Sequence, residues 1–313
     1  MPRAIVTGGA GFIGSHMTDF LIKKGYKVAV IDNLRVGKKK NINPKARFYQ
    51  RDINNLAAMI DIFKRERPDY VLHFAAQIDV RFSVDNPWED ARENIIGGIN
   101  LIEASRRAKI KKFIFSSSGG AIYGGAKKIP TPEDFRPHPL CPYGVSKLSF
   151  EEYLHCFRHM DNNPLNSISL RYANVYGPRQ DAKGEAGVIA IFTDRFLSGQ
   201  QPIINGDGKN SRDFIYVDDV VRANWQALKV RGNRHKIYNI GTGKETNINQ
   251  IFSKLKRVTS SKFMPKYGPA KIGEERRSVL DCRRARLELK WKAEVSLDSG
   301  LERTVAWFRE HGQ

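Results

Sequence analysis

VTGGAGFIG, residues 6–14, contains two overlapping glycine patterns: Gly9, Gly11 and Gly14 fit GxGxxG, and Gly8, Gly11 and Gly14 fit GxxGxxG. The stretch follows an apolar run that suits a strand and opens a segment that suits a helix. One glycine permits the tight bend, another lets the backbone approach a pyrophosphate, and the last lets helix and strand pack closely. The helix N-terminus then offers amide donors to the phosphates. The stretch therefore predicts the strand, turn and helix of a dinucleotide site.

An acidic residue ends the next predicted strand. Asp32 stands 21 residues after Gly11, the spacing of a carboxylate that binds the adenosine ribose hydroxyls. A carboxylate at this place repels the additional phosphate of NADP, so the predicted cofactor is NAD. Arg35 and Lys38, which follow closely, weaken this preference slightly.

Apolar runs alternate with helix-like segments through the first half of the chain. Strands are expected at residues 3–8, 27–32, 46–53, 69–76, 111–118 and 167–175, and helices near 12–24, 55–66, 87–108 and 142–161. This alternation, with strands rich in Val, Ile and Phe, indicates an α/β fold. We expect a Rossmann-type, doubly wound parallel sheet with helices on both faces.

The pattern changes after about residue 180. Helices are expected near 187–198, 218–229, 247–258, 281–289 and 298–311, with short strands at 202–205 and 236–241 between them. We therefore expect an NAD-binding Rossmann domain of residues 1–179, rejoined by part of 213–242. A smaller α/β C-terminal substrate domain would comprise residues 180–313.

Composition limits the classes of protein to consider. The chain has 313 residues, is 41% hydrophobic and carries a formal net charge of +20. No apolar run reaches the roughly 18 residues that suggest a membrane span. The first predicted strand begins at Arg3, so we expect no signal peptide and a cytoplasmic protein. Cys141, Cys156 and Cys282 lack zinc spacing, and reduced thiols are expected.

The positive charge fits either a nucleic-acid or membrane surface or a surface that attracts an anionic substrate. Basic residues are spread along the chain without interleaved aromatic residues, so we expect no specific nucleic-acid partner. His155 and His159 have the spacing of a zinc pair on a helix. No third ligand and no HExxH glutamate accompany them, so we expect no metal.

A tyrosine and a lysine with helical spacing form the candidate reaction site. CPYGVSK places Tyr143 and Lys147 four residues apart, which puts both side chains on one helix face. A free tyrosine has a pKa of about 10 and is a poor base near neutrality. A neighbouring ammonium and a cationic nicotinamide both favour the phenolate, so we expect the pKa of Tyr143 to fall.

A second candidate element is a predicted strand that ends in hydroxyls. In IFSSSGGAIYGG, residues 114–125, Ser116, Ser117 and Ser118 precede two glycines. No carboxylate follows until Glu133. The change from hydrocarbon to hydroxyl indicates that this strand reaches a functional site.

Together these stretches resemble the extended short-chain dehydrogenase/reductases, and within them the UDP-glucose (UDP-galactose) 4-epimerases. The resemblance covers nearly the whole chain and rests on TGGAGFIGSH, DNL, RDI, HFAA, FSSS, PYGVSK, LRYANVYGPRQ, GDGKNSRDFIYVDDV and YNIGTG. It implies an NAD-dependent isomerase of galactose metabolism that acts on a UDP-sugar. It also implies a homodimer that pairs through the helices near 92–108 and 146–160.

The resemblance implies roles for the matching positions. Those at the cofactor would be Gly8, Gly11, Phe12, Ile13, Gly14, Asp32, Asn33, Asp52, Ile53, Phe74, Ala75, Ala76, Asn94, Ser116, Tyr143, Lys147 and Tyr172. Those at the UDP-sugar would be Ser118, Tyr143, Asn174, Gly187, Val188, Arg212, Lys271, Glu274 and Ser278. Tyr143 would be the base, and Lys147 would bind the nicotinamide ribose.

The implied reaction is self-contained. Tyr143 would take the proton of the sugar 4-hydroxyl while hydride passes from C4 to NAD. The 4-keto sugar would turn over in the pocket and receive the hydride on its other face. Binding energy from the remote UDP would hold the sugar while it rotates.

The missing acid separates this chain from related enzymes that eliminate. The 4,6-dehydratases carry Asp-Glu directly after the catalytic Thr, because loss of water needs an acid and a base. The UDP-glucuronate decarboxylases usually keep a Glu there. Gly119 and Gly120 occupy these positions, so the site is expected to oxidise and reduce but not eliminate.

Two departures from the family pattern and one matching position, Ser278, matter. SSSGGAIYG is one residue longer than the common SSSATVYG, which leaves Ser117 or Ser118 as the catalytic hydroxyl; counting from the strand favours Ser118. Lys271 replaces the usual Arg and Glu274 the usual Asp, so the diphosphate would lose a bidentate partner. Ser278 is small where some epimerases are bulky, from which we hypothesise that UDP-N-acetylhexosamines also enter.

Two alternatives stay open at this point. One is a 4-epimerase of another UDP-sugar, such as UDP-N-acetylglucosamine or UDP-glucuronate. The other is a non-catalytic nucleotide- or RNA-binding relative that kept the fold. The intact Tyr143, Lys147 and glycine turn argue against the second.

Overall fold

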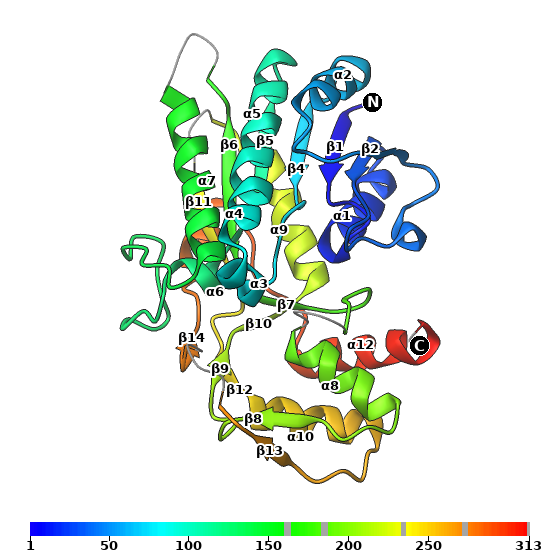
Figure 1. Cartoon of the computed structure of the whole chain (residues 1–313), viewed down its shortest axis with the longest axis vertical. Helices are drawn as coiled ribbons and strands as arrows, with labels where there is room; N and C mark the ends of the chain where they lie inside the picture. Colours follow the sequence, from blue (N-terminus) through cyan, green and yellow to red (C-terminus); the bar gives the residue numbers. More distant parts are fainter. Residues whose placement is uncertain (160–163, 183–186, 233–235, 271–274, 312–313) are drawn as a thin grey trace.

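A seven-stranded parallel sheet forms the larger part of the molecule (Figure 1). The computed structural model describes residues 1–159, 164–182, 187–232, 236–270 and 275–311. In spatial order the strands are β11 (Lys236–Ile240), β6 (Ser167–Tyr172), β5 (Lys112–Ser118), β4 (Tyr70–His73), β1 (Arg3–Thr7), β2 (Lys27–Asp32) and β3 (Arg47–Gln50). The chain winds outward from β1 in both directions, so the predicted doubly wound sheet is confirmed.

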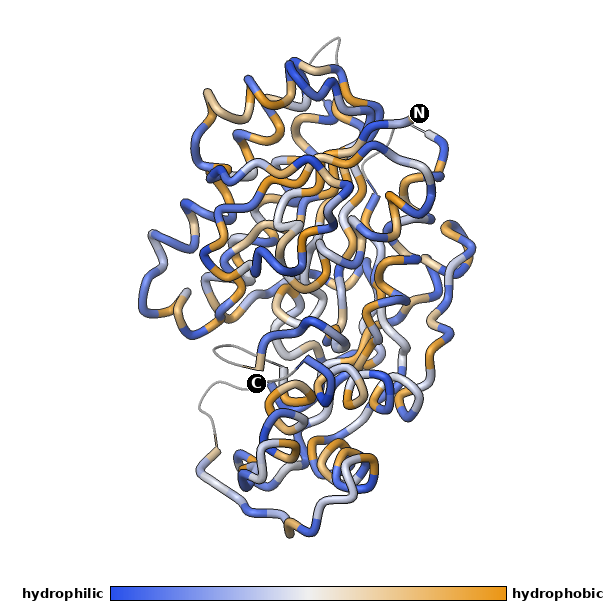
Figure 2. Tube along the Cα trace, turned by 90° about the vertical axis from the view of Figure 1, so that its right-hand side faces the viewer, coloured by the Kyte–Doolittle hydropathy of each residue, from blue (hydrophilic) through white to orange (hydrophobic). Residues whose placement is uncertain are grey.

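Helices cover both faces of this sheet, because successive strand residues point to opposite sides. Ala4 and Val6 belong to one apolar core and Ile5 to the other. The first core is closed by α1 (Phe12–Lys23) and α9 (Val217–Lys229), and the second by α2 (Leu56–Glu66), α5 (Gly97–Arg107) and α7 (Pro142–His159). Hydrophobic segments recur along the middle of this part in Figure 2.

The smaller part of the molecule has its own apolar core and lies below the sheet in Figure 1. Its helices are α8 (Val188–Leu197), α10 (Ile248–Thr259) and α12 (Leu297–His311). Its short strands are β8 (Ile203–Asn205) and β13 (Lys266–Gly268), which pair in parallel. Phe192, Phe196 and Phe252 pack together between α8 and α10.

Small sheets connect the two parts. They are built from β7 (Asn174–Tyr176) with β10 (Phe214–Tyr216), and from β12 (Thr246–Asn247), β9 (Ser211–Arg212) and β14 (Arg277–Ser278). The other elements are η1 (Lys39–Asn41), α3 (Val80–Asp85), α6 (Gly119–Ile122) and α11 (Arg283–Glu288). Within the described ranges, no helix combines the length and the apolar character that crossing a bilayer requires.

Two segments differ from the sequence expectation. The helix expected at 87–108 is divided into α4 (Pro87–Ala91), a π-helical turn η2 (Arg92–Ile96) and α5. The strand expected at 167–175 is divided between β6 and β7, which belong to different sheets. The division follows from the hydrogen bonds, because Ala173 N–H donates to Ile240 while Asn174 N–H donates to Asp213.

Candidate active site

The glycine turn lies between β1 and α1, at the carboxyl edge of the sheet. Gly8 has φ of +68°, a left-handed conformation that favours glycine. A Cβ atom on Gly8 would come within 2.6 Å of the Ala75 backbone nitrogen, and one on Gly14 would overlap the Gly8 carbonyl oxygen. The Gly11 N–H closes the turn by donating to the Gly8 carbonyl at 3.1 Å. The turn thus keeps backbone, rather than side chains, at the amino end of α1.

Asp32 is fixed beside this turn at the end of β2. Its carboxylate accepts the Ala10 N–H at 3.0 Å and the Leu34 N–H at 2.9 Å. Each carboxylate oxygen keeps a further lone pair, which suits ribose hydroxyls. Asn33 donates to Asp52 at 3.1 Å, so these two predicted cofactor residues also lie together. The glycine-rich turn leaves space in front of the N-terminus of α1, and the Asp32 carboxylate lies beside it. Together they form a site that fits a dinucleotide.

Tyr143 and Ser118 meet at the carboxyl end of β5. The Tyr143 side chain on α7 is hydrogen-bonded to the Ser118 side chain. Ser118 is the last residue of β5, and the Tyr143 N–H is held from the other side by the Ser83 hydroxyl at 3.2 Å. The structure therefore brings the predicted base and one of the two candidate hydroxyls into direct contact.

The pleat of β5 separates the three serines. The Ser117 hydroxyl donates to the buried Glu151 carboxylate, further along α7, at 2.6 Å. Ser116 lies on the same side as Ser118 and is hydrogen-bonded to the Tyr172 hydroxyl. Of the two candidate hydroxyls that the sequence left open, Ser118 is the one at Tyr143.

Lys147 lies one helical turn after Tyr143 and is buried. Its ammonium donates to the Ser116 carbonyl at 3.0 Å and stands 5.7 Å from the centre of the Tyr143 ring. Burial lowers the pKa of Lys147 to about 8, while the Asp90 and Glu151 carboxylates act in the opposite direction. The cation is therefore held next to the phenol ring by the strand that carries the serines.

The pKa of Tyr143 differs from the sequence expectation. Burial raises the pKa of the phenol above its ordinary value, and the hydrogen bond with Ser118 only partly opposes this. The expectation of a lowered pKa counted the charge of Lys147 and of a nicotinamide. In the chain itself desolvation is the larger effect, because it disfavours the phenolate.

Three of the residues predicted for the sugar nucleotide, Asn174, Arg212 and Ser278, lie on the small connecting sheets. Ser278 on β14 is the register partner of Arg212 on β9. Asn174 begins β7, and its side-chain oxygen lies 3.9 Å from where a Cβ on Gly120 would stand. Gly120 follows Ser118 by two residues, so Asn174 lies near the end of β5 that carries Ser118.

Comparison with known proteins supports this arrangement. Residues 4–241 match the model of the NAD dependent epimerase/dehydratase family. The chain belongs to this family. It is 39% identical to a UDP-glucose 4-epimerase of Mycolicibacterium smegmatis over 316 residues, covering 99% of this chain and 100% of that protein.

Two solved structures in this family are similar over nearly their full length. One is UDP-glucose 4-epimerase with UDP-glucose from Thermotoga maritima: 51% identity, TM-score 0.96, covering 98% of this chain and 99% of that chain. The other is UDP-glucose 4-epimerase in complex with NAD from Thermus thermophilus: 38% identity, TM-score 0.92, covering 99% of each chain.

The remaining predicted family positions are placed as follows. Phe74 N–H donates to the Thr7 carbonyl at 3.1 Å, and Ala75 N–H donates to the Thr7 hydroxyl at 3.3 Å, which fixes the segment from Phe74 to Ala76 beside the turn. Ile53 packs on the helix turn at Gly97. Gly187 caps α8 and Val188 begins it. Lys271 and Glu274 lie outside the described residues.

Sequence reasoning missed a buried carboxylate next to the reaction site. Asp90 accepts hydrogen bonds from Gln77 and Asn94, each at 2.9 Å, and from the Ser146 hydroxyl at 2.6 Å. The π-helical turn carries Asn94, which also donates to the Gln77 carbonyl at 3.0 Å. The sequence feature that could have indicated Asp90 is its spacing of four residues from Asn94, which places both side chains on one helix face.

A buried ion pair was missed as well. Arg171 on β6 and Glu151 on α7 pair at 2.6 Å with almost no exposed side-chain surface. Tyr123 bridges Arg171 at 2.9 Å and Asn239 at 2.8 Å. Glu151 follows Lys147 by four residues, so the helix spacing pointed to it. Through Ser117 and Arg171, Glu151 connects the ends of β5 and β6 to the middle of α7.

His155 and His159 lie with ring centres 4.9 Å apart on the exposed face of α7. Within the part of the chain that the structure describes, no group of three or more His, Cys, Asp or Glu side chains is arranged to hold a metal ion.

Proposed function

We propose that this chain is an NAD-dependent UDP-glucose 4-epimerase that interconverts UDP-glucose and UDP-galactose through a 4-keto intermediate. The observation that carries the proposal is the contact of Tyr143 with Ser118, with the Lys147 ammonium beside the phenol ring. A dinucleotide turn and an acid at the end of β2 stand at the same sheet edge. The family and the similarity to UDP-glucose 4-epimerases support the same activity.

We assign the residues of the sheet to NAD and those of the connecting sheets to the UDP-sugar. Residues 1–179, rejoined by part of 213–242, form the proposed NAD-binding domain, which is consistent with β11 pairing with β6. Residues 180–313 form the proposed UDP-sugar domain. Bound NAD supplies the hydride acceptor, and then the hydride donor, for the sugar C4.

The chain's own groups move the proton. In the proposed mechanism Tyr143 accepts the proton of the sugar 4-hydroxyl, with Ser118 as its hydrogen-bond partner. The Lys147 ammonium stabilises the phenolate, since a nearby cation favours that form. In the return step Tyr143 gives the proton back to the oxygen at C4. Tyr143 is only partly exposed, which limits the access of solvent to this exchange.

The structure offers a physical reason why elimination is not proposed. A Cβ on Gly119 would come within 2.6 Å of the Leu280 side chain, so an acid there would displace a buried residue. Glu133, the next carboxylate along the chain, accepts the Asn239 N–H at 2.9 Å and is buried. Neither position supplies an acid beside Ser118.

The test of this function is a substrate panel with the purified protein and no added NAD. UDP-galactose, UDP-glucuronate and UDP-N-acetylgalactosamine are incubated separately, and the configuration at C4 is followed by NMR. We expect rapid conversion of UDP-galactose to UDP-glucose. Exclusive turnover of UDP-glucuronate would overturn the choice of substrate.

A wider substrate range is a second outcome of the same panel. Ser278 is a small, partly buried residue on β14, and its short side chain supports room for an acetamido group. We therefore expect UDP-N-acetylgalactosamine to be epimerised as well. No turnover of the acetylated sugar would refute the wider substrate range. It would not affect the proposed epimerisation of UDP-galactose.

The two serines provide a matched pair of variants. Ser118→Ala removes the hydroxyl at Tyr143 and is expected to lower kcat by roughly 10- to 100-fold, since a positioned group in proton transfer contributes about that much or more. Ser117→Ala removes a bond to the buried Glu151 and is expected to lower Tm with kcat nearly unchanged. Steady-state kinetics measure kcat of the two variants, and thermal melts measure their Tm. The reverse pattern would assign the reaction to Ser117.

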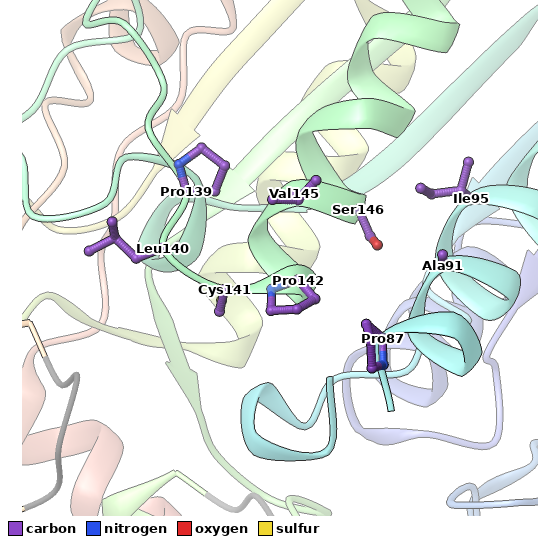
Figure 3. A pocket seen from close by; sticks show the side chains of 9 residues that line it. All are labelled: Pro87, Ala91, Ile95, Pro139, Leu140, Cys141, Pro142, Val145 and Ser146. Carbon is purple, nitrogen blue, oxygen red and sulfur yellow. The ribbon is translucent and has the colours of Figure 1, made fainter. Parts of the chain in front are cut away.

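We propose a homodimer that pairs through η2, α5 and α7, the helices near 92–108 and 146–160, with α4 beside them. Exposed apolar side chains on these helices are Trp88, Ile96, Val145 and Tyr153, which are 68%, 51%, 48% and 40% exposed. Beside them an open groove of about 480 Å³ separates Pro87, Ala91 and Ile95 from Leu140 and Val145 (Figure 3). Exposed apolar side chains beside an apolar groove are typical of a protein interface. The cytoplasmic location stays a prediction from the sequence.

Light scattering on two variants tests the dimer. Ile96→Asp places a charge on the proposed interface and is expected to give a monomer. Leu287→Asp, on α11, changes an apolar side chain that is 68% exposed and should leave the dimer intact. A wild-type monomer, or a dimer that survives Ile96→Asp at micromolar concentration, would contradict the proposed surface.

A further inference from the structure

Asp213 occupies a central place between the sheet and the proposed sugar-nucleotide residues. It is the residue between β9 and β10, and only 1% of its surface is exposed. It does not belong to the groups assigned above to proton transfer or to ligand contact. A buried carboxylate costs free energy unless it is fully hydrogen-bonded, so its partners indicate what it does.

The carboxylate of Asp213 is bound to the segment that follows β11. One oxygen accepts the Thr242 N–H at 2.8 Å and the Thr242 hydroxyl at 2.5 Å, and the other accepts the Gly243 N–H at 2.9 Å. The Leu280 N–H donates to the same group. A Cβ on Gly241 would collide with the carboxylate, so glycine is required there.

The backbone of Asp213 is bound to two of the proposed sugar-nucleotide segments. Its N–H donates to the Ser278 carbonyl at 3.0 Å, and its carbonyl accepts the Asn174 N–H at 2.9 Å. Arg212 precedes it directly in the chain. One residue therefore connects Asn174, Arg212 and Ser278, which come from three separate segments, and its side chain attaches them all to the end of β11.

We propose that Asp213 is the positioning residue that sets the affinity for the UDP-sugar. It holds Asn174, Arg212 and Ser278 at a fixed distance from the sheet that carries Tyr143 and the dinucleotide turn. This inference rests on the proposed function, because it assumes that those three residues contact the sugar nucleotide.

The predicted consequence is a selective loss of substrate affinity. Asp213→Asn keeps the volume but turns one acceptor oxygen into an NH₂ group that faces backbone N–H donors. The segments bound through Asp213 would then shift relative to the sheet. Since Tyr143, Ser118 and the dinucleotide turn have no bond to Asp213 in the described structure, chemistry and NAD binding should change little.

The experiment measures UDP affinity by calorimetry, KM and kcat with UDP-galactose, and the NAD content of the purified protein. For Asp213→Asn we expect KM and the Kd of UDP to rise about tenfold, which is a loss of about 1.4 kcal/mol, with kcat within about threefold of wild type. Thr242→Val removes only the hydroxyl donor and should shift KM in the same direction by a smaller factor.

Asp219→Asn is the matched control. Asp219 is also fully buried and also accepts two backbone N–H groups, those of Glu294 and Val295, at 3.0 and 3.1 Å. It should lower Tm without moving KM. An unchanged KM in both Asp213→Asn and Thr242→Val, or an equal rise in Asp219→Asn, would overturn the inference. If Asp213→Asn does not fold, the KM of Thr242→Val decides.

Failure of the proposed function would look different. In that case the wild-type protein itself would neither bind UDP nor epimerise UDP-galactose. An active wild type whose KM is insensitive to these variants would reject only the role of Asp213.

Discussion

Tyr143→Phe is expected to lower kcat for UDP-galactose epimerisation by about 10³-fold or more, because it removes the proposed acceptor of the sugar 4-hydroxyl proton and general acid–base groups contribute about 10²- to 10⁴-fold. The change deletes one oxygen whose partner is Ser118. The phenyl ring keeps the packing beside Lys147, so the NAD content and the Kd of UDP should stay near wild type. Steady-state kinetics, cofactor release and calorimetry measure these three quantities.

A matched tyrosine separates loss of the base from loss of a buried hydroxyl. Tyr238 is fully buried on β11, and its hydroxyl donates to Glu288 at 2.9 Å. Tyr238→Phe should lower Tm while kcat stays within about twofold of wild type, since one buried hydrogen bond contributes only about 1 kcal/mol to stability. Full activity in Tyr143→Phe would refute the assignment of the base.

Lys147→Met is expected to lower kcat by about 10²- to 10³-fold, because it removes the cation that stabilises the phenolate and leaves a side chain of similar length. The pH profile gives a second readout. The pKa of Lys147 is lowered to about 8, so its charge is present below that pH and is lost above it. The wild-type rate should therefore decline on the alkaline side, and this decline should be absent from Lys147→Met.

Lys112 is the matched control for this variant. It is buried at the opposite edge of the sheet, donates to the Ala227 and Leu228 carbonyls at 3.1 and 3.2 Å, and its pKa is also lowered by burial to about 8. Lys112→Met should lower Tm and leave kcat and its pH profile unchanged. Equal losses of activity in the two variants would show that any buried lysine is needed for folding, and would contradict the specific role of Lys147.

The fold could be predicted because its determinants are local in the sequence. The glycine turn needs residues that are adjacent in the chain, and a Cβ on Gly14 would overlap Gly8 only six residues away. The strands are recognisable because burial on both faces demands continuous apolar runs. The division of 167–175 was not predictable in the same way, because it depends on Asp213 and Ile240 offering carbonyls from distant segments.

The site could be predicted where its groups keep a characteristic spacing along the chain. Tyr143 and Lys147 are four residues apart on α7, so their common face followed from the sequence. Alternation along β5 places Ser116 and Ser118 together, but the sequence does not say which side of the sheet faces Tyr143. Three-dimensional packing makes that choice, since Ser117 is directed to Glu151.

The groups that support the site were the hardest to foresee. Asp90 meets Ser146 across a separation of 56 residues, and Arg171 meets Glu151 across 20. No periodic pattern links such positions, because each pairing depends on how a helix packs on the sheet. The polar residues were visible in the sequence, but only their burial shows that they need partners.

The fate of a label at C4 tests the central claim most directly. UDP-glucose carrying deuterium at C4 is incubated with the purified protein in ordinary water without added NAD, and the product is examined by NMR. Because the proposed mechanism removes and returns the same hydride, UDP-galactose should form with the deuterium still at C4. Loss of the deuterium to solvent hydrogen, or no formation of UDP-galactose, would contradict transient oxidation at C4 by this site.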